Sequence, residues 1–187
     1  MMGSTHLALG ALLGYTGLFL TPEYVLAAAV GGLIGGVFPD IDMPFDHRKT
    51  LHFPVYYFFI AVPAMALALL IPSGITVFLA YFFFSAAVHS AFDILGCGTE
   101  PKPWEANSEE AVYIHYLGRW GRPRRLVRYD GAPEDFLLTL LFGVPAYLLY
   151  EGRIALLVLA AIVIGGLYSL IRRRLTEFLY RRWPELF

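Results

Sequence analysis

The chain has 187 residues, of which 58% are hydrophobic and only 16% are charged. Its mean hydropathy of +0.60 is well above that of a soluble domain of this length and favours burial in a bilayer. A net charge of −1 argues against a nucleic-acid-binding protein, because such proteins need a positive excess to neutralise phosphates. The single cysteine, Cys97, allows no intrachain disulfide.

Six long apolar segments predict membrane-spanning helices, because a hydrocarbon core roughly 30 Å thick needs about 20 apolar residues per helix. We therefore expect an all-α, polytopic membrane bundle in which residues 1–187 form a single domain. No basic region precedes the first segment and no clear cleavage site follows it, so we expect it to remain in the mature protein. The segments are Leu7–Leu20, Tyr24–Phe38, Phe53–Ile71, Gly74–Leu95, Phe136–Tyr150 and Ile154–Ile171.

Basic residues are distributed unevenly over the connections between these segments. If the six helices alternate in direction, thirteen of the fourteen Arg and Lys residues lie on one side, and only Arg153 lies on the other. Basic residues mark the cytoplasmic side of a membrane protein. We therefore expect a multi-pass cell-membrane protein whose two termini, Pro39–His52 loop and long 96–135 loop are all cytoplasmic.

The first two segments are rich in glycine, a residue that lets membrane helices approach closely. We interpret these glycines as packing positions. They are Gly10, Gly14 and Gly17 in the first segment, and Gly31, Gly32, Gly35 and Gly36 in the second.

The 96–135 loop contains Asn107 followed by Glu110, a helix-start pattern of the capping-box type. It predicts a short helix that ends near Leu117 and carries His115. The basic and aromatic residues that begin at Arg119 suit the lipid headgroup region. One interpretation is a lid that brings phosphate-binding arginines to an active site, and the other is an ordinary loop attracted to anionic lipid.

Histidines and aspartates gather at the cytoplasmic ends of the first four predicted helices. His89 and Asp93 are four residues apart, so they share one helix face and can hold one ion together. Charges at the edge of an apolar slab cost about 3 kcal/mol each unless they are paired or metal-bound. Mixed His and Asp ligands predict a divalent transition metal, Zn²⁺ in the first place and Mn²⁺ or Fe²⁺ as alternatives. The predicted ligands are His6, Asp40, Asp42, His52, His89 and Asp93.

Cations close to these ligands are candidates for catalysis and substrate binding. A guanidinium can hold an anionic group through two parallel hydrogen bonds, so Arg48 is predicted to bind substrate and to act in catalysis with His47. His115 and Arg119 are further candidates for substrate binding. The alternative is that all of these side chains merely mark the cytoplasmic side of the membrane.

These residues carry a resemblance to a known family, the YdjM-type membrane-bound metal-dependent hydrolases. The resemblance covers the N-terminal half, through Thr5-His6, Pro39-Asp40-Ile41-Asp42, His47-Arg48 with His52, and His89 with Asp93. In the second half, Pro103-Trp104-Glu105 and Ala111-Val112-Tyr113-Ile114-His115 look like those of archaeal versions. The resemblance implies a broad kinship with zinc-dependent phospholipase C enzymes, although kinship of fold does not fix a substrate.

We therefore expect a hydrolase that cleaves a phosphoester or related ester in a membrane-associated substrate, with a metal-activated water as nucleophile. Its expected partners are the lipid bilayer and a lipid or phosphorylated substrate, and no nucleic acid. The alternative is a non-catalytic metal-binding membrane protein, namely a transporter, sensor or scaffold. A transporter should carry polar groups along both halves of its helices, whereas the ionisable residues here crowd one end.

Overall fold

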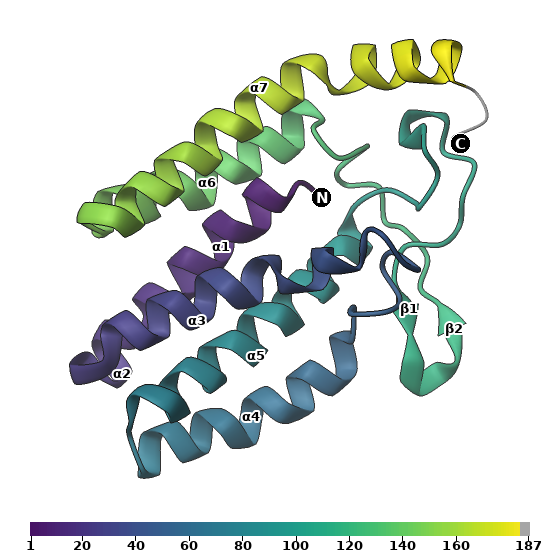
Figure 1. Ribbon diagram of the computed structural model, residues 1–187. Helices are drawn as coiled ribbons and strands as arrows, with labels where there is room; N and C mark the ends of the chain where they lie inside the picture. Colours follow the sequence, from purple (N-terminus) through teal and green to yellow (C-terminus); the bar gives the residue numbers. More distant parts are fainter. Residues whose placement is uncertain (184–187) are drawn as a thin grey trace.

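The computed structural model describes residues 1–183 as a helical bundle with a small β-hairpin at one end (Figure 1). Each of the six predicted apolar segments is largely helical. The α-helices are α1 (Gly3–Tyr15), α2 (Gly17–Leu20), α3 (Val25–Val37), α4 (Pro54–Leu70), α5 (Gly74–Phe92), α6 (Pro133–Leu149) and α7 (Gly152–Arg182). The other elements are the 3-10 helices η1 (Pro22–Tyr24), η2 (Phe38–Asp42), η3 (Asp93–Leu95), η4 (Pro103–Glu105) and η5 (His115–Leu117), with strands β1 (Tyr113–Ile114) and β2 (Arg119–Trp120).

Three helical stretches are long and apolar enough to cross a membrane, namely Pro22–Asp42, Gly74–Leu95 and Gly152–Arg182. Helix α4 is also apolar but shorter. Large apolar side chains cover the outside of the bundle, as Leu70 (81% exposed) and Leu148 (74% exposed) illustrate. Such a surface is unfavourable in water and suits hydrocarbon, which agrees with the apolar composition.

Helix α3 lies at the centre of the bundle between α1 and α5, while α4 packs on α5, and α6 and α7 pack on α1 (Figure 1). Glycines allow this arrangement, as predicted. A Cβ on Gly10 would lie 2.2 Å from the carbonyl oxygen of Gly32, and a Cβ on Gly35 would lie 2.2 Å from that of Phe82. Backbone therefore contacts backbone on both sides of α3, which fixes the ends of α3 and α5 relative to each other.

Helix α7 is longer than the sequence predicted, because it continues beyond Ile171 as far as Arg182. An ion pair between Arg173 and Glu177 one turn apart, with 3.0 Å between Nε and Oε1, supports this extension. Arg172 also forms two hydrogen bonds with the carboxylate of Asp130, which ties α7 to the 96–135 loop.

The helix predicted from Asn107 to Leu117 is wrong, because most of this stretch is a loop and a β-hairpin. The two residues of the capping pattern form local hydrogen bonds instead, Asn107 through its side chain and Glu110 through its backbone. Asn107 donates to Glu105, and the Ser108 hydroxyl accepts from the backbone N–H of Glu110. The hairpin pairs Tyr113 with Trp120. His115 lies in the short 3-10 helix η5 instead of the predicted α-helix.

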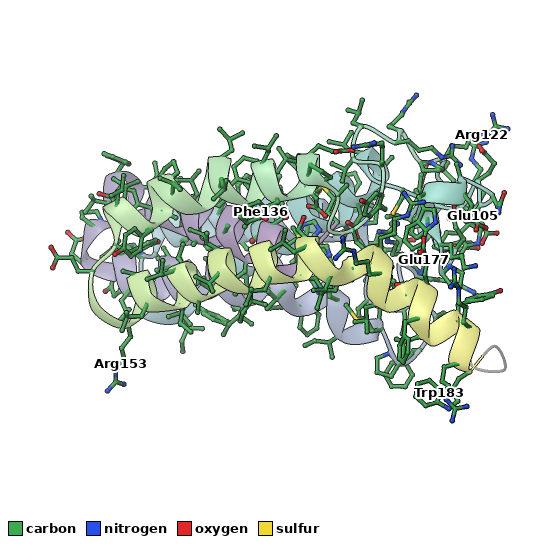
Figure 2. All side chains as sticks on the ribbon, turned by 90° about the horizontal axis from the view of Figure 1, so that it is seen from above. Glu105, Arg122, Phe136, Arg153, Glu177 and Trp183 are labelled. Carbon is green, nitrogen blue, oxygen red and sulfur yellow. The ribbon has the colours of Figure 1, made fainter. Side chains whose placement is uncertain are left out.

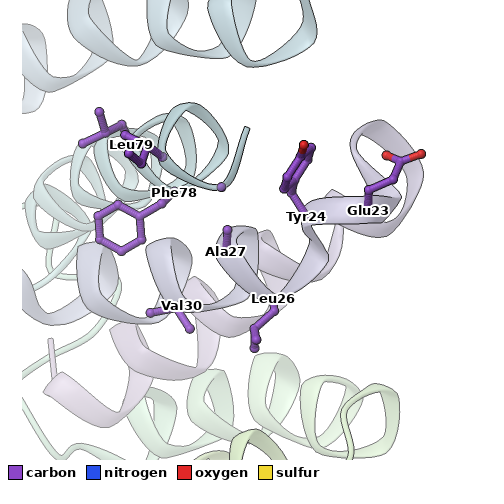
Figure 3. Close-up of a pocket in the computed structure, with 9 residues that line it drawn as sticks. Glu23, Tyr24, Leu26, Ala27, Val30, Phe78 and Leu79 are labelled. Carbon is purple, nitrogen blue, oxygen red and sulfur yellow. The ribbon is translucent and has the colours of Figure 1, made fainter. Parts of the chain in front are cut away.

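The two ends of the bundle differ in polarity. Figure 2 shows Arg153 at one end, and Glu105, Arg122 and Trp183 at the other. A groove of about 700 Å³ lies between α3 and α5 near the Arg153 end, and its walls are almost entirely apolar (Figure 3). The residues that line this apolar groove are Glu23, Tyr24, Leu26, Ala27, Val30, Gly74, Ile75, Phe78 and Leu79.

Candidate metal centre

Four of the six predicted ligands come together at the polar end of the bundle. One ligand atom from each of Asp40, His52, His89 and Asp93 lies within 4.8 Å of all the others, so this four-residue cluster can hold a metal ion. Asp40 belongs to η2, His52 precedes α4, His89 lies in the last turn of α5, and Asp93 begins η3. All are buried except Asp40, whose side chain is 12% exposed.

The distances within the cluster match the ligand shell of a single ion. The two histidine Nε2 atoms are 3.2 Å apart, and His52 Nε2 lies 3.3 Å from Asp93 Oδ2. His89 Nε2 lies 3.4 Å from Asp40 Oδ1 and 3.7 Å from Asp93 Oδ2. Ligands of a tetrahedral zinc ion, each about 2.0 to 2.1 Å from the metal, are about 3.3 to 3.4 Å from one another. The side chains therefore already stand at a suitable separation.

Hydrogen bonds on the far side of each imidazole orient the two rings. His89 Nδ1 donates to the carbonyl oxygen of Gly36 at 2.7 Å, and His52 Nδ1 donates to Asp42 Oδ2 at 2.9 Å. A proton on Nδ1 leaves the lone pair of a neutral ring on Nε2. Two lone pairs then face each other at 3.2 Å, an unfavourable contact unless a cation or an added proton lies between them. The geometry therefore suits either a bound cation or an added proton on one of the two rings.

Asp42, also predicted as a ligand, supports this cluster from behind. Its Oδ2 accepts from His52 and from the backbone N–H of Leu51 at 3.0 Å, while its Oδ1 lies 2.7 Å from His47 Nδ1. Burial alone would lower the pKa of His52, but hydrogen bonds to Asp42 and Asp93 outweigh burial and raise that pKa. Asp42, His47 and His52 also form a second group with ligand spacing, in which His52 is shared.

His6, the remaining predicted ligand, lies beside the four-residue cluster. Its ring stacks on His89 with 3.6 Å between centroids, and its Nε2 is 3.0 Å from Asp93 Oδ1. Asp93 thus faces the two clustered histidines with one oxygen and His6 with the other. His6 contacts the carboxylate edge that points away from the other ligands.

Arg48, the predicted substrate-binding and catalytic cation, is buried, with 5% of its side chain exposed. Its Nη1 donates to the carbonyl oxygen of Cys97 at 2.7 Å, and its Nε lies 3.5 Å from Asp93 Oδ2. Burial alone would lower the pKa of the Arg48 guanidinium, but the negative charges of Asp93 and Asp130 and the hydrogen bond to Cys97 together raise it. Arg48 therefore stays cationic and balances charge beside the cluster. His47, with a third of its side chain exposed, lies on the outer side of Asp42.

The other predicted substrate-binding residues lie outside the cluster. The ring of His115 packs against Phe53, the residue after His52, with 4.4 Å between centroids. Arg119 is exposed on β2. The backbone N–H of Tyr113 donates to the carbonyl oxygen of Arg48 at 2.9 Å, so the hairpin is bonded to the loop that carries His47 and His52.

One supporting residue, Asp135, was not singled out from the sequence. It is fully buried and accepts hydrogen bonds from the backbone N–H of Met2 at 2.8 Å and the hydroxyl of Thr5 at 2.7 Å. These bonds fix the start of α1 and hence the position of His6. Pro133 followed by two acidic residues is a helix-start signal that marks this place in the sequence. This signal does not predict that Asp135 accepts hydrogen bonds from Met2 and Thr5.

In comparisons with known proteins, no family model, curated protein or solved structure matches this chain. The resemblance to YdjM-type hydrolases therefore stays a prediction. Fold and cluster together define a class: a helical protein with an apolar exterior and a buried His and Asp cluster that can hold a metal ion.

Proposed function

We propose that this protein is a membrane-bound metal-dependent hydrolase whose ion is held by Asp40, His52, His89 and Asp93. The observation that carries the proposal is that the Nε2 atoms of His52 and His89 lie 3.2 Å apart beside two carboxylates. The ion is proposed to be Zn²⁺, because two imidazoles and two carboxylates at tetrahedral spacing suit it, with Mn²⁺ and Fe²⁺ as alternatives.

The protein is proposed to cross the membrane six times with this site on the cytoplasmic side. The isolation of Arg153 at the opposite end supports that orientation (Figure 2). The proposed substrate is a phosphoester or related ester in a membrane-associated molecule. A site at the end of an apolar bundle is close to the level at which such an ester bond lies.

Hydrolysis needs room for a water molecule beside the ion. A metal ion held by these residues would act as a Lewis acid and would lower the pKa of that water. Asp40 is the best-placed residue to provide it, because it is the most exposed of the four ligands. Its Oδ2 is also buried without a hydrogen-bond partner in the described part of the chain. Asp40 can therefore swing outward or accept a proton from water with that free oxygen. Arg48 offsets negative charge from the side of Asp93.

A second candidate function is non-catalytic metal binding, and one observation favours it. Four protein ligands around a buried point are typical of structural zinc sites, whereas catalytic sites usually have three ligands and a water. A sensor or scaffold would need no change at Asp40. The two functions agree on the ion and differ only in turnover.

The test is metal analysis of detergent-purified protein by mass spectrometry, followed by an activity screen on lipid and soluble phosphoesters. We expect one equivalent of metal in the wild type and a large loss in His52→Ala and His89→Ala. His115→Ala, outside the cluster, is the matched control and should keep its metal. Equal metal in all four proteins would contradict the site. A metal-loaded protein without turnover on any ester would favour the sensor or scaffold.

A further inference from the structure

A second polar feature lies on the hairpin side of the 96–135 loop. It is a cleft of about 640 Å³, a size typical of small-molecule sites, and no acidic residue lines it. Three arginines, Arg119, Arg122 and Arg124, line the cleft and are called the cleft arginines below. The other lining residues are Ile94, Ile114, Trp120 and Gly121.

The cleft arginines differ from neighbouring cations because they have no acidic partner. Nearby, Arg125 Nη2 lies 3.2 Å from Glu109 Oε1, and Arg128 Nε lies 2.7 Å from Glu134 Oε1. No side chain of the cleft arginines forms an ion pair or a hydrogen bond within residues 1–183. Three unpaired positive charges around one cleft repel one another and attract an anion.

Backbone hydrogen bonds hold the walls of the cleft in place. The N–H of Arg124 donates to the carbonyl oxygen of Ile94 at 2.8 Å, and the N–H of Gly121 donates to that of Val112 at 2.8 Å. The arginine side chains are exposed, but they project from a fixed backbone. A ligand therefore needs to order only side chains, which reduces the entropic cost of binding.

The remaining lining identifies the kind of anion. Ile94, Ile114 and Trp120 give the cleft an apolar wall beside its positive charges. Tyr116 (72% exposed) and Leu117 (49% exposed) extend this apolar surface along the hairpin. The cleft lies at the polar end of an apolar bundle, near Arg122 in Figure 2. Aromatic and basic side chains at that level are typical of contact with lipid headgroups.

We propose that this cleft binds the phosphate headgroup of an anionic membrane lipid. Guanidinium groups form paired hydrogen bonds with phosphate oxygens, and Trp120 with the two isoleucines contacts the glycerol and the first carbons of the chains. The proposal does not depend on hydrolase activity, because none of the residues that line the cleft is a candidate metal ligand.

The experiment measures binding to the full-length protein in uncharged detergent by microscale thermophoresis. The probes are short-chain phosphatidylglycerol below its micelle concentration, the matching diacylglycerol and inorganic phosphate. We expect phosphatidylglycerol to bind most tightly. Replacing all three cleft arginines by Ala should weaken its binding at least about tenfold, because one charge-assisted hydrogen bond alone contributes about that factor.

The matched control removes three positive charges from α7, through Arg174→Ala, Arg181→Ala and Arg182→Ala together. It should change the affinity less than about twofold, because screened charges outside the cleft contribute little. Equal losses in the two triple variants would overturn the proposal in favour of general charge attraction. Inorganic phosphate that binds as tightly as the lipid would overturn the lipid assignment, and so would diacylglycerol that binds equally well.

Discussion

The apolar groove and the four-residue cluster lie near opposite ends of α3 and α5, yet they differ in the ligands that they can bind. At the Arg153 end, the apolar groove is large, and Glu23 is the one residue among those that line it that carries a charge at neutral pH (Figure 3). At the other end, α3 continues into η2 and α5 ends, and four ligand groups meet there. Size alone is therefore a poor guide to function in this bundle. The convergence of ligands is a better guide.

The largest expected effect tests whether close packing holds the polar end together. Gly35→Ala would place a Cβ 2.2 Å from the Phe82 carbonyl oxygen, whereas Gly74→Ala near the apolar groove meets nothing within 4 Å. Such overpacking against backbone should cost about 3 kcal/mol or more, while the control should stay close to wild type. Thermal unfolding in detergent measures both. Equal melting temperatures for the two variants would mean that α3 and α5 can separate without loss.

An intermediate effect tests the support behind the cluster. Asp42→Ala removes the carboxylate that orients His52, so Zn²⁺ affinity should fall about 10- to 100-fold, as is typical for loss of such a partner. Glu23→Ala in the apolar groove should leave the affinity unchanged. Competition with a coloured chelator measures both values. An unchanged affinity in Asp42→Ala would show that the hydrogen bond from His52 to Asp42 is not needed to orient the His52 ring for metal binding.

The smallest effect concerns the pH dependence of an ion pair between Arg128 and Glu134, which belong neither to the apolar groove nor to the four-residue cluster. The hydrogen bond from Arg128 lowers the pKa of Glu134 to about 2, against an ordinary value near 4.5. Because the folded-state pKa is lowered, the stabilisation is complete above about pH 4.5 and is lost as the pH falls towards about 2. Glu134→Gln should therefore lose a little stability at neutral pH and converge with wild type in acid. Parallel unfolding curves from pH 6 to 2.5 would contradict this pair.

Most of the helical architecture could be predicted, because long apolar runs leave few alternatives to helix. The ligand set could be predicted only as a group of six. Asp40 and Asp42 look equivalent in sequence, but they lie in a 3-10 helix with about three residues per turn, so residues two apart point in different directions. Asp40 lies next to Nε2 of His89, whereas Asp42 lies next to Nδ1 of His52, on the side of that ring away from the cluster. Sequence spacing alone could not distinguish a ligand from its support.

The 96–135 loop could not be predicted, because its structure depends on partners distant in sequence. The backbone N–H groups of Arg124 and Leu126 donate to carbonyl oxygens of the segment that follows Asp93. The backbone N–H of Tyr113, in the hairpin, donates to the carbonyl oxygen of Arg48. Neither contact leaves a periodic pattern. The capping-box pattern at Asn107 was misleading, since the Asn107 side chain and the Glu110 backbone form hydrogen bonds within the loop instead.

The backbone conformation of Arg48 sets two stabilising effects against each other at this position. Arg48 has φ of 62°, a left-handed conformation that costs a residue other than glycine about 1 to 2 kcal/mol. Glycine would relieve that strain at once, yet it would also remove the positive charge beside Asp93. Removing one partner of a buried ion pair costs about 3 to 5 kcal/mol, which exceeds the backbone strain, so Arg48→Gly should be less stable than wild type despite the relaxed backbone.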